Sequence, residues 1–253
     1  MYLNLDNPIA ERLNKIVYRD ENKTVKLFIK EYSKSIVLNE ALNQARVEEG
    51  TNLNIPRLIE VSKIDDRWAL VSEYIEGTPL DVLMARHPEK MEEYLNKFID
   101  LQLEIQSNTV PMLNRMIEKF TRKITEANNI PENVKYELLQ RLDGMKKHNK
   151  VCHGDYNPSN VIIKDDGTAY VIDWAHVTQG NGAGDAARTF LLFSIEGKDE
   201  IAKRYLELFS KKSGTDYSLI QNWIPIVAAS QMSKQRPEEQ EFLSKWIDVI
   251  DYQ

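Results

Sequence analysis

Alternating apolar and polar residues predict short strands in the first third of the chain. These runs cover residues 16–19, 23–29, 58–64 and 68–75. A period of two is typical of half-buried strands, and the short polar segments at 20–22 and 65–67 are typical of tight turns. Between the two pairs, residues 33–48 carry apolar side chains at helical spacing, and Gly50 marks a helix end. The predicted order is strand, strand, helix, strand, strand.

Beyond Pro79, apolar residues recur mostly at helical spacing. Apolar stripes mark helices at 91–105, 112–124 and 134–145, and further helical stretches are predicted near 184–196, 199–212, 217–232 and 237–249. Amphipathic helices bury such stripes, so we assign them to a core rather than to a cofactor. Because a strand ends in Gly77 and Pro79, we predict an N-terminal lobe over 1–76 and a helical lobe over 77–253.

A second strand pair, 161–163 and 169–172, interrupts the helical part of the chain. The two runs are joined by residues 164–168, which include a glycine, and this pattern predicts a hairpin. Asn160 enters the first strand and Asp173 leaves the second, so the hairpin brings their side chains to one end. Asp155 precedes Asn160 in a loop that Pro158 prevents from continuing as an ordinary helix.

These three polar residues form a candidate site for phosphoryl transfer. A carboxamide oxygen from Asn160 and a carboxylate from Asp173 are hard ligands of the kind that Mg²⁺ binds together with phosphates and waters. Asp155 supplies a second carboxylate that orients or deprotonates a hydroxyl. The alternative is structural, because Asp and Asn residues often cap turns and end strands. Each residue alone fits that alternative, whereas the whole set in this order favours chemistry.

The same residues form a motif, His153-x-Asp155-x-x-x-x-Asn160 followed by Ile172-Asp173-Trp174. This motif resembles the catalytic loop and metal-binding aspartate of protein-kinase-like enzymes. Gly154 stands where protein kinases carry arginine, which makes the chain more similar to the aminoglycoside phosphotransferase and choline kinase branch. The resemblance is strong over 150–190 and weaker over 16–80. It implies an α+β, bilobal, protein-kinase-like fold: a small antiparallel-sheet N-terminal lobe with one helix, and a larger helical C-terminal lobe.

The resemblance also implies a role for each residue of the site. Asp155 becomes the catalytic base, while Asn160 and Asp173 become the ligands of Mg²⁺. Lys26, in the strand segment Val-Lys-Leu, is similar to the lysine that grips the phosphates of ATP or GTP, and Glu40 is its best-matching partner. Without the resemblance, Lys26 fits equally well as a solvated lysine on a half-exposed strand.

Further positions follow from the resemblance alone. Glu73 and Ile75 occupy the segment that resembles a hinge, where backbone groups would meet an adenine edge. His153 is expected to brace the catalytic loop rather than to act on substrate. Asp185 resembles an aspartate that also braces this loop, although a helix N-cap is an equally good explanation.

One departure concerns the loop that covers the phosphates in the family. That loop usually contains glycines, which let the backbone approach closely. Residues 7–18 contain none, and Leu13 stands where a glycine would be expected. Arg12, Asn14 and Lys15 are candidates for side-chain contacts instead. The alternative is a nucleotide-binding protein with little or no turnover.

Composition limits the partners of the chain. Its 253 residues carry a net charge of −6 without a basic run, which argues against nucleic acid as the main partner. Cys152 is the single cysteine and cannot form an internal disulfide, and no segment has the length or apolarity of a membrane span. We therefore expect a cytoplasmic protein with no membrane and no obligate protein partner.

The predicted activity is transfer of the γ-phosphoryl group of ATP or GTP to a small-molecule hydroxyl, with an amino sugar or amino alcohol as a candidate acceptor. If the acidic end of the chain contacts the acceptor, a cationic acceptor is expected, with Glu238 near the apolar stripe of Phe242, Trp246 and Ile250, and Glu239 off that stripe. A solvated acidic helix face is the alternative.

Two other activities are less consistent with the residues. A protein kinase would carry an arginine in place of Gly154 and an Ala-Pro-Glu segment after Asp173. A metal hydrolase built on His153, Asp155 and Asp173 would need further histidines, and the chain has only 4.

Overall fold

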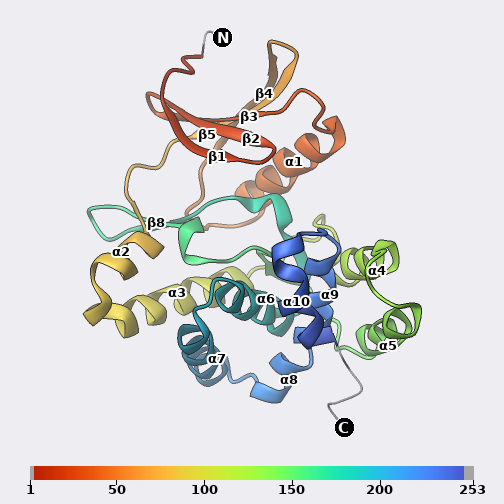
Figure 1. The fold of residues 1–253 in the computed structure, drawn as a ribbon. Helices are drawn as coiled ribbons and strands as arrows, with labels where there is room; N and C mark the ends of the chain where they lie inside the picture. Colours follow the sequence, from red (N-terminus) through yellow and green to blue (C-terminus); the bar gives the residue numbers. More distant parts are fainter. Residues whose placement is uncertain (1–2, 248–253) are drawn as a thin grey trace. The chain divides into compact units, whose positions relative to one another are not determined.

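The computed structural model describes residues 3–247 (Figure 1). Its contacts divide the chain into two compact units. The first contains the residues up to Lys90 together with Pro158–His176, and the second contains Met91–Asn157 and the residues from Val177 onward. These units do not follow the predicted division at 76 and 77, because residues 77–90 and the central hairpin pack within the first unit. The fold class is α+β, as the sequence predicted.

The first unit is built on a five-stranded antiparallel sheet in the order β1-β2-β3-β5-β4. Its strands are β1 (Pro8–Arg12), β2 (Lys15–Asp20), β3 (Lys23–Phe28), β4 (Leu58–Ile64) and β5 (Arg67–Glu73). The four predicted strands are present, within a few residues at their ends. β1 was not predicted: the glycine-free segment over 7–18 forms a hairpin of β1 and β2.

Helix α1 (Lys34–Gly50) lies beside this sheet (Figure 1). Val37 and Ala41 of α1 pack with Phe28 and Leu70 of the sheet. Val25 and Leu27 belong to a separate cluster with Ala69 and Val71. Since side chains alternate between the faces of a strand, Lys26 shares the face of Phe28 and points to the side that α1 covers.

The predicted central hairpin is present in the first unit. Strands β8 (Val161–Ile163) and β9 (Ala169–Val171) pair antiparallel, and β6 (Thr78–Pro79) adds a third strand, followed by α2 (Leu80–Arg86). Gly77 is required at this junction, because a Cβ atom there would lie 2.6 Å from the Ile163 carbonyl oxygen. The Val171 N–H donates to the Asn54 carbonyl at 3.0 Å, which ties the hairpin to the segment before β4.

The second unit is mostly helical. Its helices are α3 (Met91–Gln106), α4 (Met116–Glu126), α5 (Glu132–Asp143), α6 (Gly182–Ile195), α7 (Asp199–Ser213), α8 (Tyr217–Gln221), α9 (Ile224–Met232) and α10 (Pro237–Ile247). Two short strands, β7 (Lys150–Cys152) and β10 (Thr178–Gly180), pair antiparallel. α6 and α9 are buried along almost their whole length and form the centre of the unit.

The helix boundaries differ from the prediction in two places. The stripe at 112–124 forms a helix only from Met116. The stretch at 217–232 is split into α8 and α9, and Pro225 lies in the first turn of α9. A proline lacks the N–H that a helix interior needs but is tolerated in a first turn, which explains this break. Between residues 3 and 247, no helix is long and apolar enough to cross a membrane.

Candidate active site

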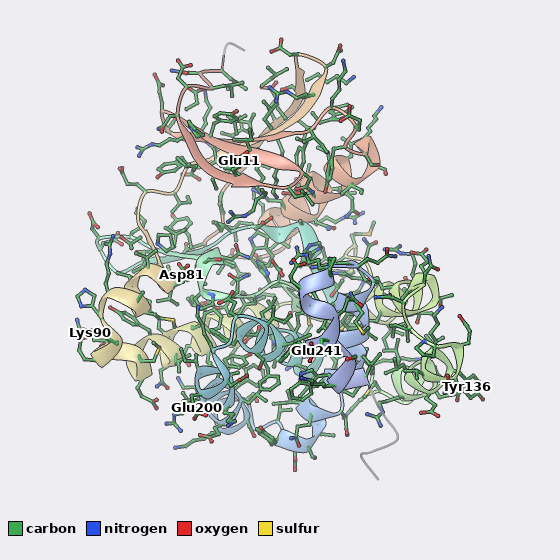
Figure 2. All side chains as sticks on the ribbon, viewed as in Figure 1. Glu11, Asp81, Lys90, Tyr136, Glu200 and Glu241 are labelled. Atoms are coloured by element: carbon green, nitrogen blue, oxygen red, sulfur yellow. The ribbon has the colours of Figure 1, made fainter. Side chains whose placement is uncertain are left out.

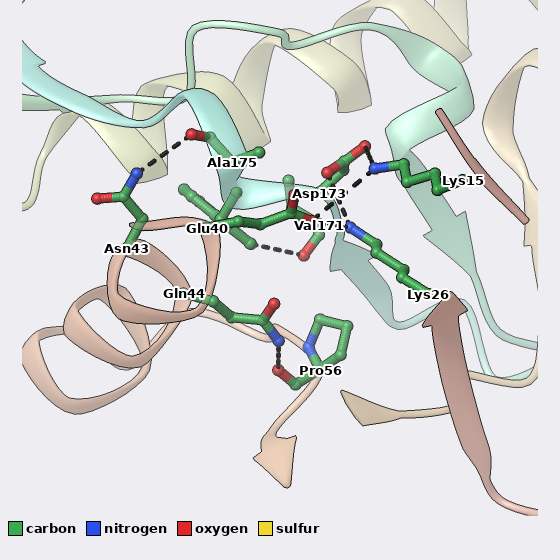
Figure 3. A network of polar contacts seen from close by, with 10 residues as sticks. Lys15, Lys26, Glu40, Asn43, Gln44, Pro56, Val171, Asp173 and Ala175 are labelled. Atoms are coloured by element: carbon green, nitrogen blue, oxygen red, sulfur yellow. Dashed lines mark hydrogen bonds and ion pairs between the residues drawn. The ribbon is translucent and has the colours of Figure 1, made fainter. Parts of the chain in front are cut away.

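The first unit places Lys26 between two acidic side chains (Figure 3). Its Nζ donates to Glu40 Oε1 at 2.6 Å and to Asp173 Oδ1 at 2.9 Å. Burial acts to lower the pKa of Lys26, but the charges of Asp173 and Glu40 outweigh this effect and leave the pKa raised. Lys26 therefore stays charged at neutral pH. Glu40, which sequence analysis chose as the partner, makes this contact from the buried face of α1.

A second lysine reaches the same two carboxylates. Lys15 Nζ lies 3.9 Å from Glu40 Oε1 and 3.9 Å from Asp173 Oδ2. Figure 3 shows the Lys15 side chain pointing toward these acids. Burial, followed by the nearby charge of Lys26, lowers the pKa of Lys15. Among the three candidates from the glycine-free segment, Lys15 is the one that extends to these acids, because it starts β2 directly after the turn. Leu13, at the tip of that turn, is fully exposed.

Asn160 and Asp173 lie at the same end of the hairpin, as their positions in the sequence predicted. The Ile172 N–H donates to the Asn160 carbonyl at 2.9 Å, and both side chains line one cavity. Asp173 has a φ of 63°, a left-handed conformation that Asp tolerates better than most residues. Trp174, buried beside it, donates from Nε1 to the Val171 carbonyl and fixes the chain at this point.

The oxygen donors of Asn160 and Asp173 fit Mg²⁺. Among the described residues, no group of three or more His, Cys, Asp or Glu side chains could hold a metal ion by itself. Mg²⁺ commonly uses one or two carboxylates and completes its shell with phosphates and waters. An amide oxygen and one carboxylate that line a cavity next to two lysines fit that requirement.

The cavity has a volume of about 460 Å³ and lies entirely within the first unit. Its polar lining includes both lysines of the site, and its apolar lining includes Val17, Ile162 and Ile172. Glu73 ends β5 and Ile75 follows it, and both line the cavity. Among residues 3–247, no backbone group bonds to the Ile75 N–H, whereas the Glu73 N–H donates to the Arg57 carbonyl at 2.9 Å. The N–H of Ile75 and the carbonyl of Glu73 are thus the candidate backbone groups for binding an adenine edge.

Asp155 belongs to the second unit, in the loop that follows β7. The preceding Gly154 has a φ of 78°, which favours glycine, and its N–H donates to Asp185 Oδ1 at 2.8 Å. His153 is fully buried, and its Nδ1 accepts from the Asp155 N–H at 3.3 Å. Tyr156 stacks on Phe98 and donates its hydroxyl to the Phe98 carbonyl at 2.7 Å. The loop is therefore held from both sides of Asp155.

Asp185 lies inside α6 rather than at its cap. Asn181 is the N-cap, where its side chain accepts from the Ala183 N–H at 2.9 Å. Asp185 instead accepts from Gln102 Nε2 at 3.1 Å and from Gln106 Nε2 at 3.4 Å in addition to the loop. These contacts place Asp185 where it can brace the loop of Asp155.

Sequence reasoning missed Arg188 as a residue of this region. Its side chain extends from α6, and Nη2 lies 3.3 Å from Asp155 Oδ1. Arg188 is only 8% exposed, so this ion pair lies largely out of water. A signal was present, because Arg188 follows Asp185 by three residues and therefore shares its helix face.

A sequence model of the phosphotransferase enzyme family matches residues 38–220, which is more than half of the chain. The chain belongs to this family. The match includes Glu40, the loop of Asp155 and both candidate metal ligands. A search among curated proteins finds no match.

Solved structures with a similar fold include aminoglycoside phosphotransferases. An apo structure of a thermostable mutant of aminoglycoside phosphotransferase APH(4)-Ia has a TM-score of 0.70 and 9% identity over 95% of this chain and 90% of that one. Aminoglycoside phosphotransferase APH(3'')-Id from Streptomyces rimosus, in complex with ADP and streptomycin, has a TM-score of 0.62 and 16% identity over 85% of this chain and 90% of that one. At these identities the likeness concerns the fold, which is the kinase-like fold that the sequence motif implied.

The acidic end of this phosphotransferase-family chain differs from the prediction. Glu239, expected to lie off the buried stripe, is 6% exposed, accepts from Gln231 Nε2 and pairs with Arg236 at 2.9 Å. Glu238 and Glu241 are exposed instead, and Glu241 is labelled on α10 in Figure 2. The prediction that Glu238 lies near the buried stripe and Glu239 lies off it is wrong, because the buried face of α10 contains residues 239, 243 and 247. Ile250, Asp248 and Asp251 lie outside the described residues.

Proposed function

We propose that the protein transfers the γ-phosphoryl group of ATP or GTP to a hydroxyl of a small molecule. The observation that carries this proposal is the cavity of the first unit, which is lined by Lys15, Lys26, Asn160 and Asp173 and by the hinge-like segment of residues 73–75. Phosphoryl transfer depends mostly on positioning and on neutralising phosphate charge, and this cavity provides cations and hard oxygen ligands together. Membership of the phosphotransferase enzyme family supports the same reaction.

Each residue has a role in the proposed reaction. Asp155 orients the acceptor hydroxyl and takes its proton while the hydroxyl oxygen bonds to the γ-phosphorus. The bond from that phosphorus to the β-phosphate oxygen breaks, and the nucleoside diphosphate leaves. Lys26, steadied by Glu40, holds the phosphates, and the backbone of Glu73 and Ile75 holds the adenine edge. Mg²⁺, held by Asn160 and Asp173, would neutralise phosphate charge when bound.

His153 and Asp185 act on the loop and not on the substrate. Their hydrogen bonds to the backbone of Asp155 and Gly154 fix the direction of the Asp155 side chain. Arg188 adds a charge-assisted contact to the same carboxylate. An aspartate held in this way loses little freedom when the acceptor arrives, which favours catalysis by positioning.

The glycine-free segment raised the alternative of a nucleotide-binding protein without turnover. Lys15 places an ammonium beside Asp173, and this charge would assist phosphate binding without a glycine-rich loop. ADP formation distinguishes turnover from binding alone. A cytoplasmic location, where nucleoside triphosphates are abundant, fits the proposal. An amino sugar or amino alcohol as the acceptor stays a prediction from the sequence. Streptomycin and hygromycin B accompany nucleotides in solved relatives of the same fold.

The proposal is tested by nucleotide-coupled ADP release across amino sugars, amino alcohols, sugars and their acidic derivatives. Replacement of the base by Asp155→Asn is expected to lower transfer by about 10²–10⁴-fold while nucleotide binding is retained. Asp165→Asn, an exposed aspartate in the hairpin turn, is the matched control. Near wild-type transfer by Asp155→Asn would remove Asp155 from the role of base. Nucleotide binding with no ADP formed from any acceptor would favour the binding protein.

A further inference from the structure

A group of four basic side chains in the second unit consists of Arg188, which forms an ion pair with Asp155, and three lysines near Arg188. Lys119 and Lys123 come from α4, Arg188 comes from α6, and Lys234 follows the end of α9. α4 and α6 both pack against α9, so the three helices form one local framework. Gly184 of α6 fits closely against Met116 of α4, where a Cβ atom would lie 3.0 Å from the methionine sulfur. Lys119 and Arg188 lie about one helical turn beyond this contact on their own helices.

The four cations lie close enough for the charge of Arg188 to lower the pKa of each of the three lysines. Arg188 is buried and touches Asp155, while Lys119 and Lys123 are only partly exposed. Burial, followed by the charges of Lys123, Arg188 and Lys234, lowers the pKa of Lys119 to about 7, and the charge of Asp155 counteracts this only in part. Lys234 keeps solvent access, yet desolvation by its surroundings, followed by the charge of Arg188, lowers its pKa as well.

The positive charge of this cluster exceeds the negative charge beside it. Of the residues that the structure describes, none forms an ion pair with Lys123 or Lys234. The main opposing charge is Asp155, with Glu126 further along α4 near Lys123. This excess occurs in a chain whose net charge is −6. Like charges held together in partly buried positions destabilise the folded protein, and a bound anion would relieve that repulsion.

We propose that the acceptor carries an anionic group, a phosphate or a carboxylate, which binds this basic cluster while Asp155 receives the hydroxyl. The proposal rests on the proposed function, since it assumes that Asp155 faces the acceptor. It is the alternative to the cationic acceptor expected from the acidic end of the chain, whose exposed glutamates lie on α10. A cationic amine would be repelled at the cluster, whereas an anion gains charge-assisted hydrogen bonds from lysine and arginine.

Inorganic phosphate is the first probe, and calorimetry on the full protein saturated with ADP and Mg²⁺ is the readout. The double variant Lys123→Gln/Lys234→Gln is expected to bind phosphate about tenfold more weakly. The double variant Lys147→Gln/Lys211→Gln removes the same charge from exposed positions elsewhere and is the matched control. Equal phosphate binding by wild type and the cluster variant would overturn the proposal. Circular dichroism of both variants establishes that they are folded.

The second probe is a set of acceptors that share a hexose-derived skeleton but differ in charge: glucose, glucosamine, gluconate and glucose 6-phosphate. A lower KM for the anionic members, raised by the cluster variant and by salt, supports the proposal and distinguishes carboxylate from phosphate. A preference for glucosamine that the cluster variant leaves unchanged overturns it. If phosphate binds as expected but no acceptor yields ADP, the proposed function fails while anion binding by the cluster stands.

Discussion

Removal of the Lys26 ammonium tests how the first unit balances its charges. In Lys26→Met, the carboxylates of Glu40 and Asp173 lose the cation that contacts them at 2.6 and 2.9 Å. Removing one partner from a buried ion pair costs about 3–5 kcal/mol of stability, because the remaining charge stays uncompensated. Lys15 lies 3.9 Å from both carboxylates and offsets part of this loss. We therefore expect destabilisation near the lower end, about 3 kcal/mol.

A second substitution distinguishes the loss of stability caused by charge from the loss caused by packing. Lys26→Met/Glu40→Gln leaves one carboxylate and an uncharged amide, so the repulsion that destabilises the single variant disappears. The double variant is expected to recover about half of the lost stability, a coupling within the range typical of contacting residues. Mg²⁺ is expected to stabilise Lys26→Met more than the wild type, because the ion can compensate Asp173 once the ammonium is gone.

The assay is urea unfolding followed by tryptophan fluorescence, with and without Mg²⁺, and the free energy of unfolding is obtained from the midpoint and slope. A loss within about 0.5 kcal/mol for Lys26→Met, the size typical of surface substitutions, would refute the claim that this pair is buried and coupled. Equal destabilisation of the single and double variants would show that lost packing, and not lost charge, sets the effect.

The remaining predictions concern binding. Asp173→Ala should weaken Mg²⁺-dependent nucleotide binding more than Asn160→Ala, since a carboxylate supplies charge as well as an oxygen. Titration of Mg²⁺ against bound nucleotide measures the effect of each variant, and equal small effects would exclude both residues as metal ligands. Lys15→Met should weaken ATP binding about tenfold in calorimetry, whereas Leu13→Gly should change it little. A larger effect of Leu13→Gly than of Lys15→Met would contradict the idea that the Lys15 side chain takes the place of a glycine-rich loop. Burial lowers the pKa of Lys119 to about 7, so this side chain gains its charge below that pH; binding of sulfate, whose own charge is constant between pH 8 and pH 6, should therefore strengthen toward pH 6 with proton uptake, and pH-independent sulfate binding would contradict this.

Local patterns in the sequence predicted most elements of the fold. Alternation in β3 placed Val25 and Lys26 on opposite faces of the strand, as the structure has them. In α1 the apolar spacing predicted the helix but not its buried face, since Ile36 and Leu42 are exposed while Glu40 is buried, and only the family resemblance selected Glu40. The hairpin prediction likewise brought Asn160 and Asp173 together, because antiparallel pairing returns the chain to its starting end. β1 was missed because only one of its five residues is even partly buried, so it leaves almost no hydrophobic pattern.

Contacts between distant segments could not be predicted in the same way. Arg188 meets Asp155, and Lys119 approaches both, only because α4 and α6 pack against α9. No spacing in the sequence specifies that arrangement, which depends on close packing such as that between Gly184 and Met116. α10 begins at Pro237, as predicted, yet its buried face follows residues 239, 243 and 247, because packing against α9 buries Glu239 and leaves Glu238 exposed.

The glycine-free hairpin of β1 and β2 has a consequence for the entropy of nucleotide binding. A glycine-rich loop has many accessible backbone conformations and loses them when it closes on a ligand, at a cost of roughly 0.5–1 kcal/mol for each glycine. Here the segment is already paired as strands, and Lys15 is already drawn toward Glu40 and Asp173 before any nucleotide arrives. The binding site is thus preorganised: less conformational freedom is left to lose, and what the nucleotide must instead displace is an ion pair.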